Sequence, residues 1–130
     1  MIKEFEHFVN SDAKYMKLLA HLATYLFNIG YEFGGNQYNT EITKDGKYIF
    51  AIVIRDITDD NNLGEWCICF KNSSDKRTTD NICSELVEHL KIIDGLEYHN
   101  YYDGTFNILG DIDNILKDVK VFFDVRKYNL

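Results

Sequence analysis

The Asp45-Gly46 dipeptide restricts the fold of this chain more than any other feature of its sequence. It separates two segments, 38–44 and 47–56, that are rich in β-branched and aromatic residues. An Asp-Gly pair in this position favours a two-residue turn in which both central residues have positive φ. We therefore expect an antiparallel hairpin. The second segment is the most apolar of the chain, which predicts a central strand that is covered on both faces.

Further strands are expected after this hairpin. In residues 65–71, aromatic and aliphatic side chains alternate with two cysteines, so the cysteines should share one face of a strand. Residues 96–102 and 105–109 predict a second hairpin around Asp103-Gly104. The intervening stretches are polar and read as loops.

Three segments have apolar residues at helical spacing. The first, which Ser11 or Asp12 can cap, ends at Gly30. The other two cover residues 79–94 and 112–125. The positions expected to be buried are Tyr15, Leu18, Leu19, Leu22, Leu26 and Ile29, then Ile82, Cys83, Leu86, Val87, Leu90 and Ile93, then Ile112, Ile115, Leu116, Val119, Phe122 and Phe123.

The order of elements is therefore helix, three strands, helix, two strands, helix (α-β-β-β-α-β-β-α). Strands in runs form antiparallel sheets, and helices then pack on one face. The predicted fold class is α+β, with an antiparallel sheet of about four to five strands and three helices. The stretch 119–125 also fits a strand, and we assign it to the third helix. A chain of 130 residues has the size of one domain, so residues 1–130 should form a single globular unit.

The composition is acidic, because 21 Asp and Glu residues against 14 Lys and Arg residues give a formal net charge of -7. Proteins that bind nucleic acid need basic residues to neutralise phosphates, and arginine is scarce here. We expect no direct binding to nucleic acid and, instead, a protein partner with a basic surface. The nine Phe and nine Tyr residues exceed what a minimal core needs, which predicts exposed aromatic contacts.

The cysteines Cys67, Cys69 and Cys83 do not have the spacing of a zinc finger or a zinc ribbon. With His89 they would form a zinc site only if the fold brought them together, and buried thiols are the simpler interpretation. The sequence places no histidine beside a thiolate for Cys-His catalysis. Phosphate loops and nucleophile elbows also lack their signatures. We predict no cofactor, no metal and no catalytic residue, and leave open whether the chain is an enzyme.

The polar loop that follows the apolar strand has the composition of a calcium loop without its register. Counted from Asp56, the sixth position is Asn61, where the turn of such a loop needs glycine. We assign Asp56, Asp59, Asp60 and Glu65 to a surface that a basic partner recognises. Weak cation binding and a plain solvated loop are the alternatives.

The stretch 98–102 concentrates aromatic side chains around His99. We assign Tyr98, Tyr101 and Tyr102 to the same partner surface. The alternatives are a base-stacking or ligand-binding surface and an exposed sheet face with ordinary cross-strand aromatic pairs.

These features favour a small acidic protein-binding inhibitor that acts by occlusion. Phage anti-defence proteins of the anti-CRISPR kind and immunity proteins that neutralise a toxin have this profile. Acidic side chains would steer the association and tyrosines would supply the affinity. The N-terminus does not resemble a signal peptide, and no apolar run is long enough to span a bilayer. We therefore expect a cytoplasmic protein, in a bacterial or phage-infected cell, without a membrane partner.

Two other functions stay open. An antiparallel sheet with helices on one face can hold a small-molecule-binding or hydrolytic site without a standard motif. His99, Tyr101, Asp56 and Glu65 would be its candidate residues. The chain could instead be a self-assembling structural or regulatory module, because a free sheet edge and surplus aromatic residues permit a homodimer.

Overall fold

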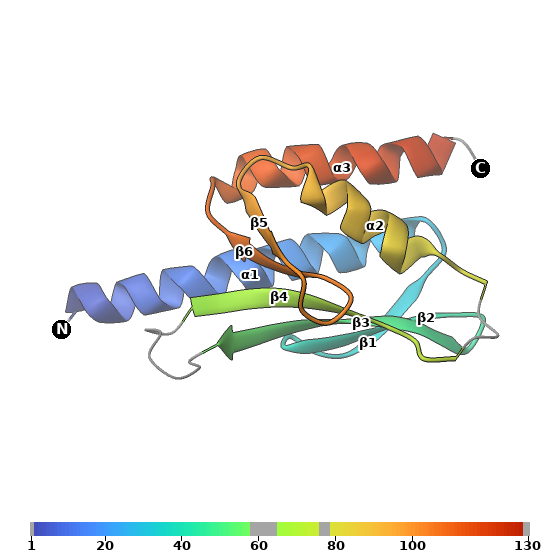
Figure 1. Cartoon of the computed structure of the whole chain (residues 1–130), viewed down its shortest axis with the longest axis horizontal. Coiled ribbons are helices and arrows are strands. Elements are labelled where there is room, and N and C mark those ends of the chain that lie inside the picture. The colour runs from blue at the N-terminus through green and yellow to red at the C-terminus, as the bar shows by residue number, and fades with distance from the viewer. Residues whose placement is uncertain (1, 58–64, 76–78, 129–130) are drawn as a thin grey trace.

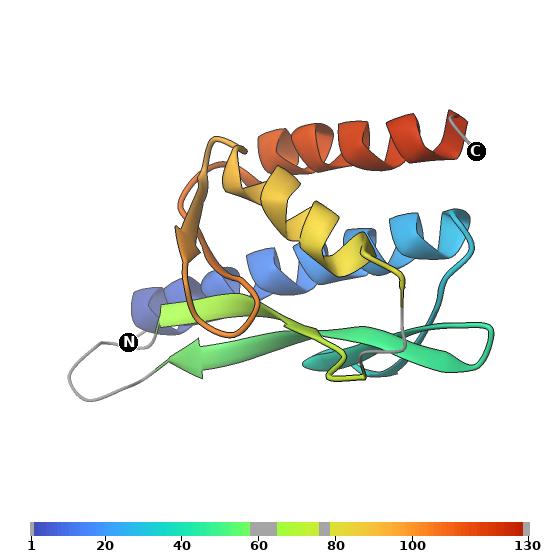
Figure 2. The same ribbon diagram turned by 45° about the vertical axis from the view of Figure 1, so that its right-hand side comes forward.

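Three helices lie on one face of a single antiparallel sheet (Figure 1, Figure 2). The computed structural model describes the backbone of residues 2–57, 65–75 and 79–128, and the side chains of residues 13–56, 66–75 and 79–128. Within these residues the α+β class is confirmed, and the predicted elements follow one another in the predicted order with one extra strand, β1 (Glu32–Asn36), directly after the first helix. The sheet has six strands, however, where four to five were predicted. None of the described helices is long and apolar enough to cross a membrane.

The elements alternate between helices and runs of strands along the chain. The helices are α1 (Ile2–Asn28), α2 (Ile82–Lys91) and α3 (Ile112–Tyr128). The strands are β1 (Glu32–Asn36), β2 (Asn39–Lys44), β3 (Lys47–Ile57), β4 (Glu65–Asn72), β5 (Leu96–His99) and β6 (Thr105–Ile108). Their spatial order is β1-β2-β3-β4-β6-β5, so β1 and β5 form the two edges of the sheet.

Strand β1 is the element that the sequence did not predict. It contains Gly34-Gly35, and glycine is depleted in strands because it has no side chain to pack. The strand forms because Asn36 closes a tight turn, in which its Oδ1 accepts hydrogen bonds from the amides of Tyr38 (2.8 Å) and Asn39 (3.1 Å). Gly35 has a φ of 94°, and a Cβ there would overlap the carbonyl oxygen of Asn39. Only glycine fits this position.

Helix α1 begins at Ile2, so neither Ser11 nor Asp12 starts it. Instead, α1 is one continuous helix of 27 residues. The predicted end is confirmed: Gly30 has a φ of 105°, and the amide of Tyr31 donates to the carbonyl of Leu26 (3.0 Å).

The first hairpin is confirmed. Asp45 and Gly46 have φ angles of 53° and 75°, and they join Lys44 to its register partner Lys47. Ile49 is the extra residue of a bulge in this pair, because Ile42 pairs with Phe50 and the next residue, Thr43, pairs with Tyr48.

Strand β3 is central, but helices cover only one of its faces, so the predicted coverage on both faces is wrong. On the other face Val53 is half-buried and Arg55 is exposed. Ala51 is buried there because it is small and its register partners, Glu41 and Lys71, have long side chains that can lie beside it. The apolar sequence of β3 therefore reflects its central place in the sheet and not a second layer of helices.

The second hairpin differs from its prediction. Strands β5 and β6 are joined by the loop 100–104 and not by a two-residue turn at Asp103-Gly104. Instead, the amide of Asp103 donates to the carbonyl of Phe70 (3.2 Å), and the amide of Phe70 donates to the carbonyl of Gly104 (2.8 Å). These two residues thus continue the pairing of β6 with β4. The reversal of the chain falls on Tyr102, which has a φ of 55°.

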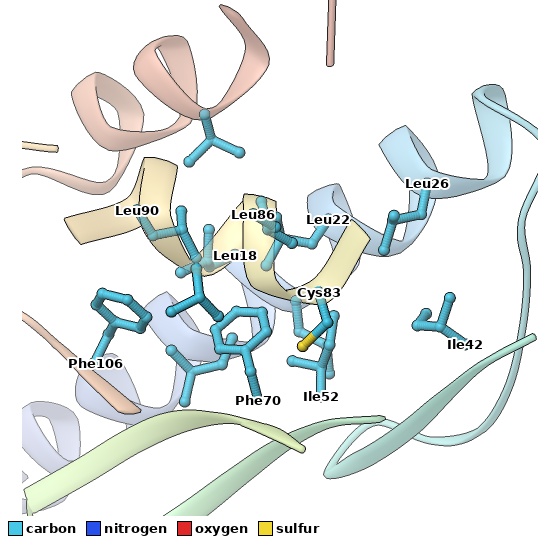
Figure 3. Packing of buried hydrophobic residues seen from close by; sticks show 14 of the residues in the cluster. Leu18, Leu22, Leu26, Ile42, Ile52, Phe70, Cys83, Leu86, Leu90 and Phe106 are labelled. Atoms are coloured by element: carbon cyan, nitrogen blue, oxygen red, sulfur yellow. The ribbon is translucent and has the colours of Figure 1, made fainter. Parts of the chain in front are cut away.

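The core lies between the sheet and the helices, with α1 and α2 next to the sheet and α3 stacked over them (Figure 2). Leucines of α1 and α2 gather over Phe70 of β4 and Phe106 of β6 (Figure 3). The stretch 119–125 is helical. Every position predicted to be buried belongs to this core, with Ile29, Ile112 and Phe122 partly buried at its margin.

Leu22 lies fully buried at the centre of this core (Figure 3). We expect Leu22→Ala to lower the free energy of unfolding by about 2–5 kcal/mol, because it removes buried methyl groups and leaves a cavity. Urea denaturation followed by circular dichroism measures the loss. Leu109→Ala is the matched control, since Leu109 is exposed, and it should change stability by less than about 0.5 kcal/mol. Equal losses in the two variants would contradict this core.

Candidate functional site

We call the face of the sheet that has no described helix the open face, and the loop 100–104 lies beside β4 of this sheet (Figure 2). Side chains of a strand alternate between its two faces. On β4, Cys67 and Cys69 belong to the open face, as predicted, while Ile68 and Phe70 face the helices. The loop places two tyrosine side chains on this face.

Tyr102 is held between two cations. The guanidinium carbon of Arg55 lies 5.6 Å from the centre of its ring, and Lys71 Nζ lies 4.5 Å from it. Arg55 also donates a hydrogen bond to the Tyr102 hydroxyl. The ring of Tyr101 packs edge to face against it, with ring centres 4.5 Å apart. These contacts hold a bulky residue at positive φ, a conformation that costs about 1–3 kcal/mol.

Two further hydrogen bonds fix the loop to the sheet. The Thr105 hydroxyl donates to the carbonyl oxygen of Tyr101 (2.7 Å), and the amide of Asn72 donates to Asp103 Oδ2 (2.7 Å). The Thr105 hydroxyl also contacts Cys69 Sγ, at the longer distance of 3.5 Å. The loop is therefore anchored at both of its ends, on β6 and on β4.

A pair of thiols lies on the same open face, next to Thr105 at the end of the loop. Cys67 and Cys69 are both buried, with their sulfurs 3.6 Å apart. The hydrogen bond to Cys69, together with burial, raises the pKa of Cys67. The hydrogen bond from Cys67 lowers the pKa of Cys69, and the positive charges of Arg55 and Lys71 act in the same direction while burial opposes them. Cys69 is thus the more acidic thiol, but in this conformation it is closed to a substrate.

The third thiol belongs to another part of the molecule. Cys83 lies on α2 and points into the core on the helix side of the sheet (Figure 3), so it does not join the other two cysteines. His89, on the same helix, contacts the carbonyl oxygen of Asp118 (3.0 Å). In the described part of the chain, no three His, Cys, Asp or Glu side chains are grouped so that they could hold a metal ion.

The structure separates the residues assigned to the partner surface. Tyr101 and Tyr102 lie together on the open face. Tyr98 packs instead against Phe106 on the helix side, with ring centres 5.5 Å apart, and Asp56, next to Arg55 on β3, falls on that side too. The residues assigned to this surface therefore do not all lie on one face of the sheet. The structure does not describe the side chains of Asp59, Asp60 and Glu65, the other residues assigned to this surface.

Sequence reasoning missed the residues that support the tyrosines, namely Arg55, Lys71 and Thr105. Alternation along β3 and β4 could have placed Arg55 and Lys71 on one face with the cysteines. The sequence carries no signal that β6 pairs with β4, and only this pairing brings the loop over those two strands.

A cavity of about 380 Å³ lies elsewhere, between α1 and the β1–β2 hairpin. The described residues that line it include no histidine and no carboxylate. They are Met16, Leu19, Ala20, Ala23, Phe33, Gly34, Gly35, Asn36, Gln37 and Thr40. His99, the candidate catalytic histidine, contacts Glu97 (2.9 Å) at the exposed β5 edge instead. The geometry therefore offers no acid–base pair inside this cavity.

Acidic side chains of the described structure lie on several elements, among them α2, β5 and α3. Several are paired with a basic side chain. The pairs are Lys17–Asp113, Lys91–Glu88, His99–Glu97, Lys120–Asp124 and Arg126–Glu85. The tyrosine loop, with Arg55 and Lys71 beside it, is the most distinctive surface of the sheet.

Comparisons with protein-family models, with curated proteins and with solved structures find no match to this chain.

Removing the Tyr102 ring should make the two thiols of the open face more accessible, because Tyr102 contacts Arg55 and Lys71 on the same face. We expect Tyr102→Ala to raise the rate at which Cys67 and Cys69 react with Ellman's reagent by about tenfold or more, because local opening then costs less. Mass spectrometry of peptides assigns the labelled cysteine. Tyr48→Ala is the control, since Tyr48 is equally exposed but belongs to the other hairpin. Unchanged labelling of Cys69 would show that Tyr102 does not cover it.

Burial raises the pKa of Cys83 to about 12. A thiol in the unfolded chain ionises near pH 8.5, so the stability that this difference contributes is fully present below about pH 8.5 and is lost as the pH rises toward 12. We expect Cys83→Ala to make the fall in unfolding free energy between about pH 9 and pH 11 shallower, by up to about 1.4 kcal/mol per pH unit. Urea denaturation across this range measures both slopes, and identical slopes would contradict the shift.

Proposed function

We propose that this protein is a protein-binding inhibitor that acts by occlusion and that contacts its target through the loop 100–104 on the open face. The observation that carries the proposal is the strained but well-supported conformation of Tyr102 at the surface. Its side chain is 40% exposed, yet two cations, one hydrogen bond and Tyr101 hold it in a strained conformation. Strain of this kind is retained where the surrounding structure enforces it, which occurs most often at functional sites.

The chemistry of the loop supports a protein target. Tyrosine and arginine are the side chains that most often dominate the energy of a protein interface. Tyr101 is 56% exposed, so a target can bury much of its ring. Because the loop is already ordered by its own contacts, little conformational entropy is lost on binding.

The charge of the chain supports a second part of the proposal, a target that is basic overall. A net charge of -7 steers a basic protein toward this one over long distances. The contact itself is of a different kind, since Arg55 and Lys71 flank the tyrosines. The matching surface should therefore offer carboxylates or backbone carbonyls to these cations within a basic protein, such as a toxin or a defence nuclease.

Replacing Tyr101 tests the proposal. In a pull-down from host lysate, followed by affinity measurement with the recovered protein, we expect Tyr101→Ala to weaken binding about thirtyfold, the effect of an anchor worth about 2 kcal/mol. Inhibition of the recovered enzyme should fall in parallel. Tyr128→Ala is the matched control, because Tyr128 is an exposed tyrosine on α3, far from the loop in the sequence and on another element.

Two results would overturn the proposal. One is a set of recovered proteins that does not depend on Tyr101. The other is tight binding of single-stranded nucleic acid at this loop, since tyrosines beside cations can also stack on bases and neutralise phosphates. Thermal unfolding of Tyr101→Ala shows whether a loss of binding reflects a loss of folding.

A further inference from the structure

We infer that a second copy of this chain docks on the free edge of β1, so that two β1 strands pair antiparallel across a two-fold axis. This interface goes beyond the proposed function, because it lies at the opposite edge of the sheet from β5 and the tyrosine loop. The two inferences therefore stand or fall separately.

Strand β1 has the properties of a pairing edge. All of its five residues are exposed, and it has a neighbouring strand on one side only. Natural edge strands are commonly blocked by lysine, proline or inward-pointing charges. Here Glu32 is the single charged residue, at one end, and the middle of the strand is Phe33-Gly34-Gly35.

The hydrogen-bonding phase of the edge follows from its neighbours. The amide of Ile54 on β3 donates to the carbonyl of Tyr38 (2.9 Å), which sets the alternation for β2 and, through the register, for β1. Gly34 thus directs its amide and carbonyl toward β2. Phe33 and Gly35 direct theirs toward the free edge, where a second chain can pair with them.

One register satisfies this phase with full overlap of the two strands. It centres on Gly34, so that Phe33 of each copy lies opposite Gly35 of the other, in a pair joined by hydrogen bonds. Glu32 then lies opposite Asn36 of the second copy, and no like charges face each other. Such an interface is isologous, which closes a dimer and stops further growth.

The same register places the Phe33 ring of each copy next to the cavity beside Gly35 of the other copy. Phe33 and Gly35 share the helix side of β1, since their partners on β2 are Ile42 and Thr40, which are buried under the helices. Beside Gly35 lies the cavity of about 380 Å³, which α1 lines with apolar side chains such as Leu19. Phe33 lines the same cavity in its own chain and is 52% exposed, so the exposed part of its ring can be covered at the mouth of the second copy's cavity.

An aromatic ring placed across from a strand glycine covers the backbone that the glycine leaves bare. Gly35 has to remain glycine, because a Cβ there would overlap the Asn39 carbonyl oxygen, so its backbone has no side chain of its own to cover it. Phe27 packs edge to face with Phe33 at 6.3 Å and is itself exposed, so it enlarges the apolar area that the second copy would cover. The edge is thus complementary to itself in backbone, shape and charge.

Light scattering after size-exclusion chromatography tests the dimer on the full chain. We expect a concentration-dependent dimer, and we expect Phe33→Ser to raise its dissociation constant at least tenfold. Ile92→Ser is the matched control. Ile92 directly follows α2, is 80% exposed and has no place in the proposed contact. A wild-type chain that stays monomeric, or a dimer that Phe33→Ser leaves intact, would overturn the inference.

A cysteine placed on the two-fold axis tests the register. Gly34 tolerates substitution, because a Cβ there meets nothing within 4 Å. In the proposed pair the two Gly34 Cα atoms form a non-hydrogen-bonded pair about 4.5 Å apart, within reach of a disulfide. With oxidised glutathione, Gly34→Cys should therefore form a covalent dimer much faster than Glu32→Cys, which lies away from the axis.

Equal cross-linking of the two cysteine variants would overturn the register, and faster cross-linking of Glu32→Cys would do the same. Tyr101→Ala must leave the dimer unchanged, so its failure to bind a target is distinguishable from a failure to dimerise. If an extended peptide of another protein occupied the edge instead, the purified chain would be monomeric and Gly34→Cys would not cross-link to itself.

Discussion

The pairing of β3 with β4 is the interaction on which the rest of the structure depends. On the helix side it places Ile52 beside Phe70 and Ile54 beside Ile68, and these side chains form the floor of the core. On the open face the same register aligns Arg55 with Cys67. Each partner strand then adds to this pair, β2 on one side and β6 on the other. Both surfaces of the molecule are consequences of one register, because alternation sends neighbouring residues to opposite faces.

The two edges of the sheet have different properties for a physical reason. At the β5–β6 end, the loop 100–104 folds back and makes contacts with cations and with the β4 backbone, so its tyrosines are ordered before any partner arrives. At the other end, β1 carries glycines and one exposed phenylalanine, and among the described residues no strand pairs with its outer side. One end of the sheet thus has an ordered loop, and the other has an exposed edge strand. A dimer through β1 would leave both tyrosine loops accessible and so present two binding surfaces.

Local patterns predicted those elements whose side chains explain them. Asp45-Gly46 formed the predicted turn because its positive φ angles are a property of the dipeptide. The helical stripes were correct because burial follows helical periodicity. Strand β1 was missed because nothing in Gly34-Gly35 favours a strand; the turn at Asn36 and the ladder with β2 impose it. Of the candidate site, the two tyrosines were found, and the cations that hold them were not.

What the sequence alone determined is the class of the fold, the faces of its helices and strands, and the excess of acidic and aromatic side chains. These are short-range properties, since periodicity and turn chemistry depend on residues a few positions apart. Only the tertiary structure decided that β6 lies beside β4, that Tyr98 turns inward while Tyr101 and Tyr102 turn outward, and that Tyr102 meets Arg55. Arg55 and Tyr102 are 47 positions apart in the chain. Their contact arises from the order of the strands, which the whole core selects and no local pattern encodes.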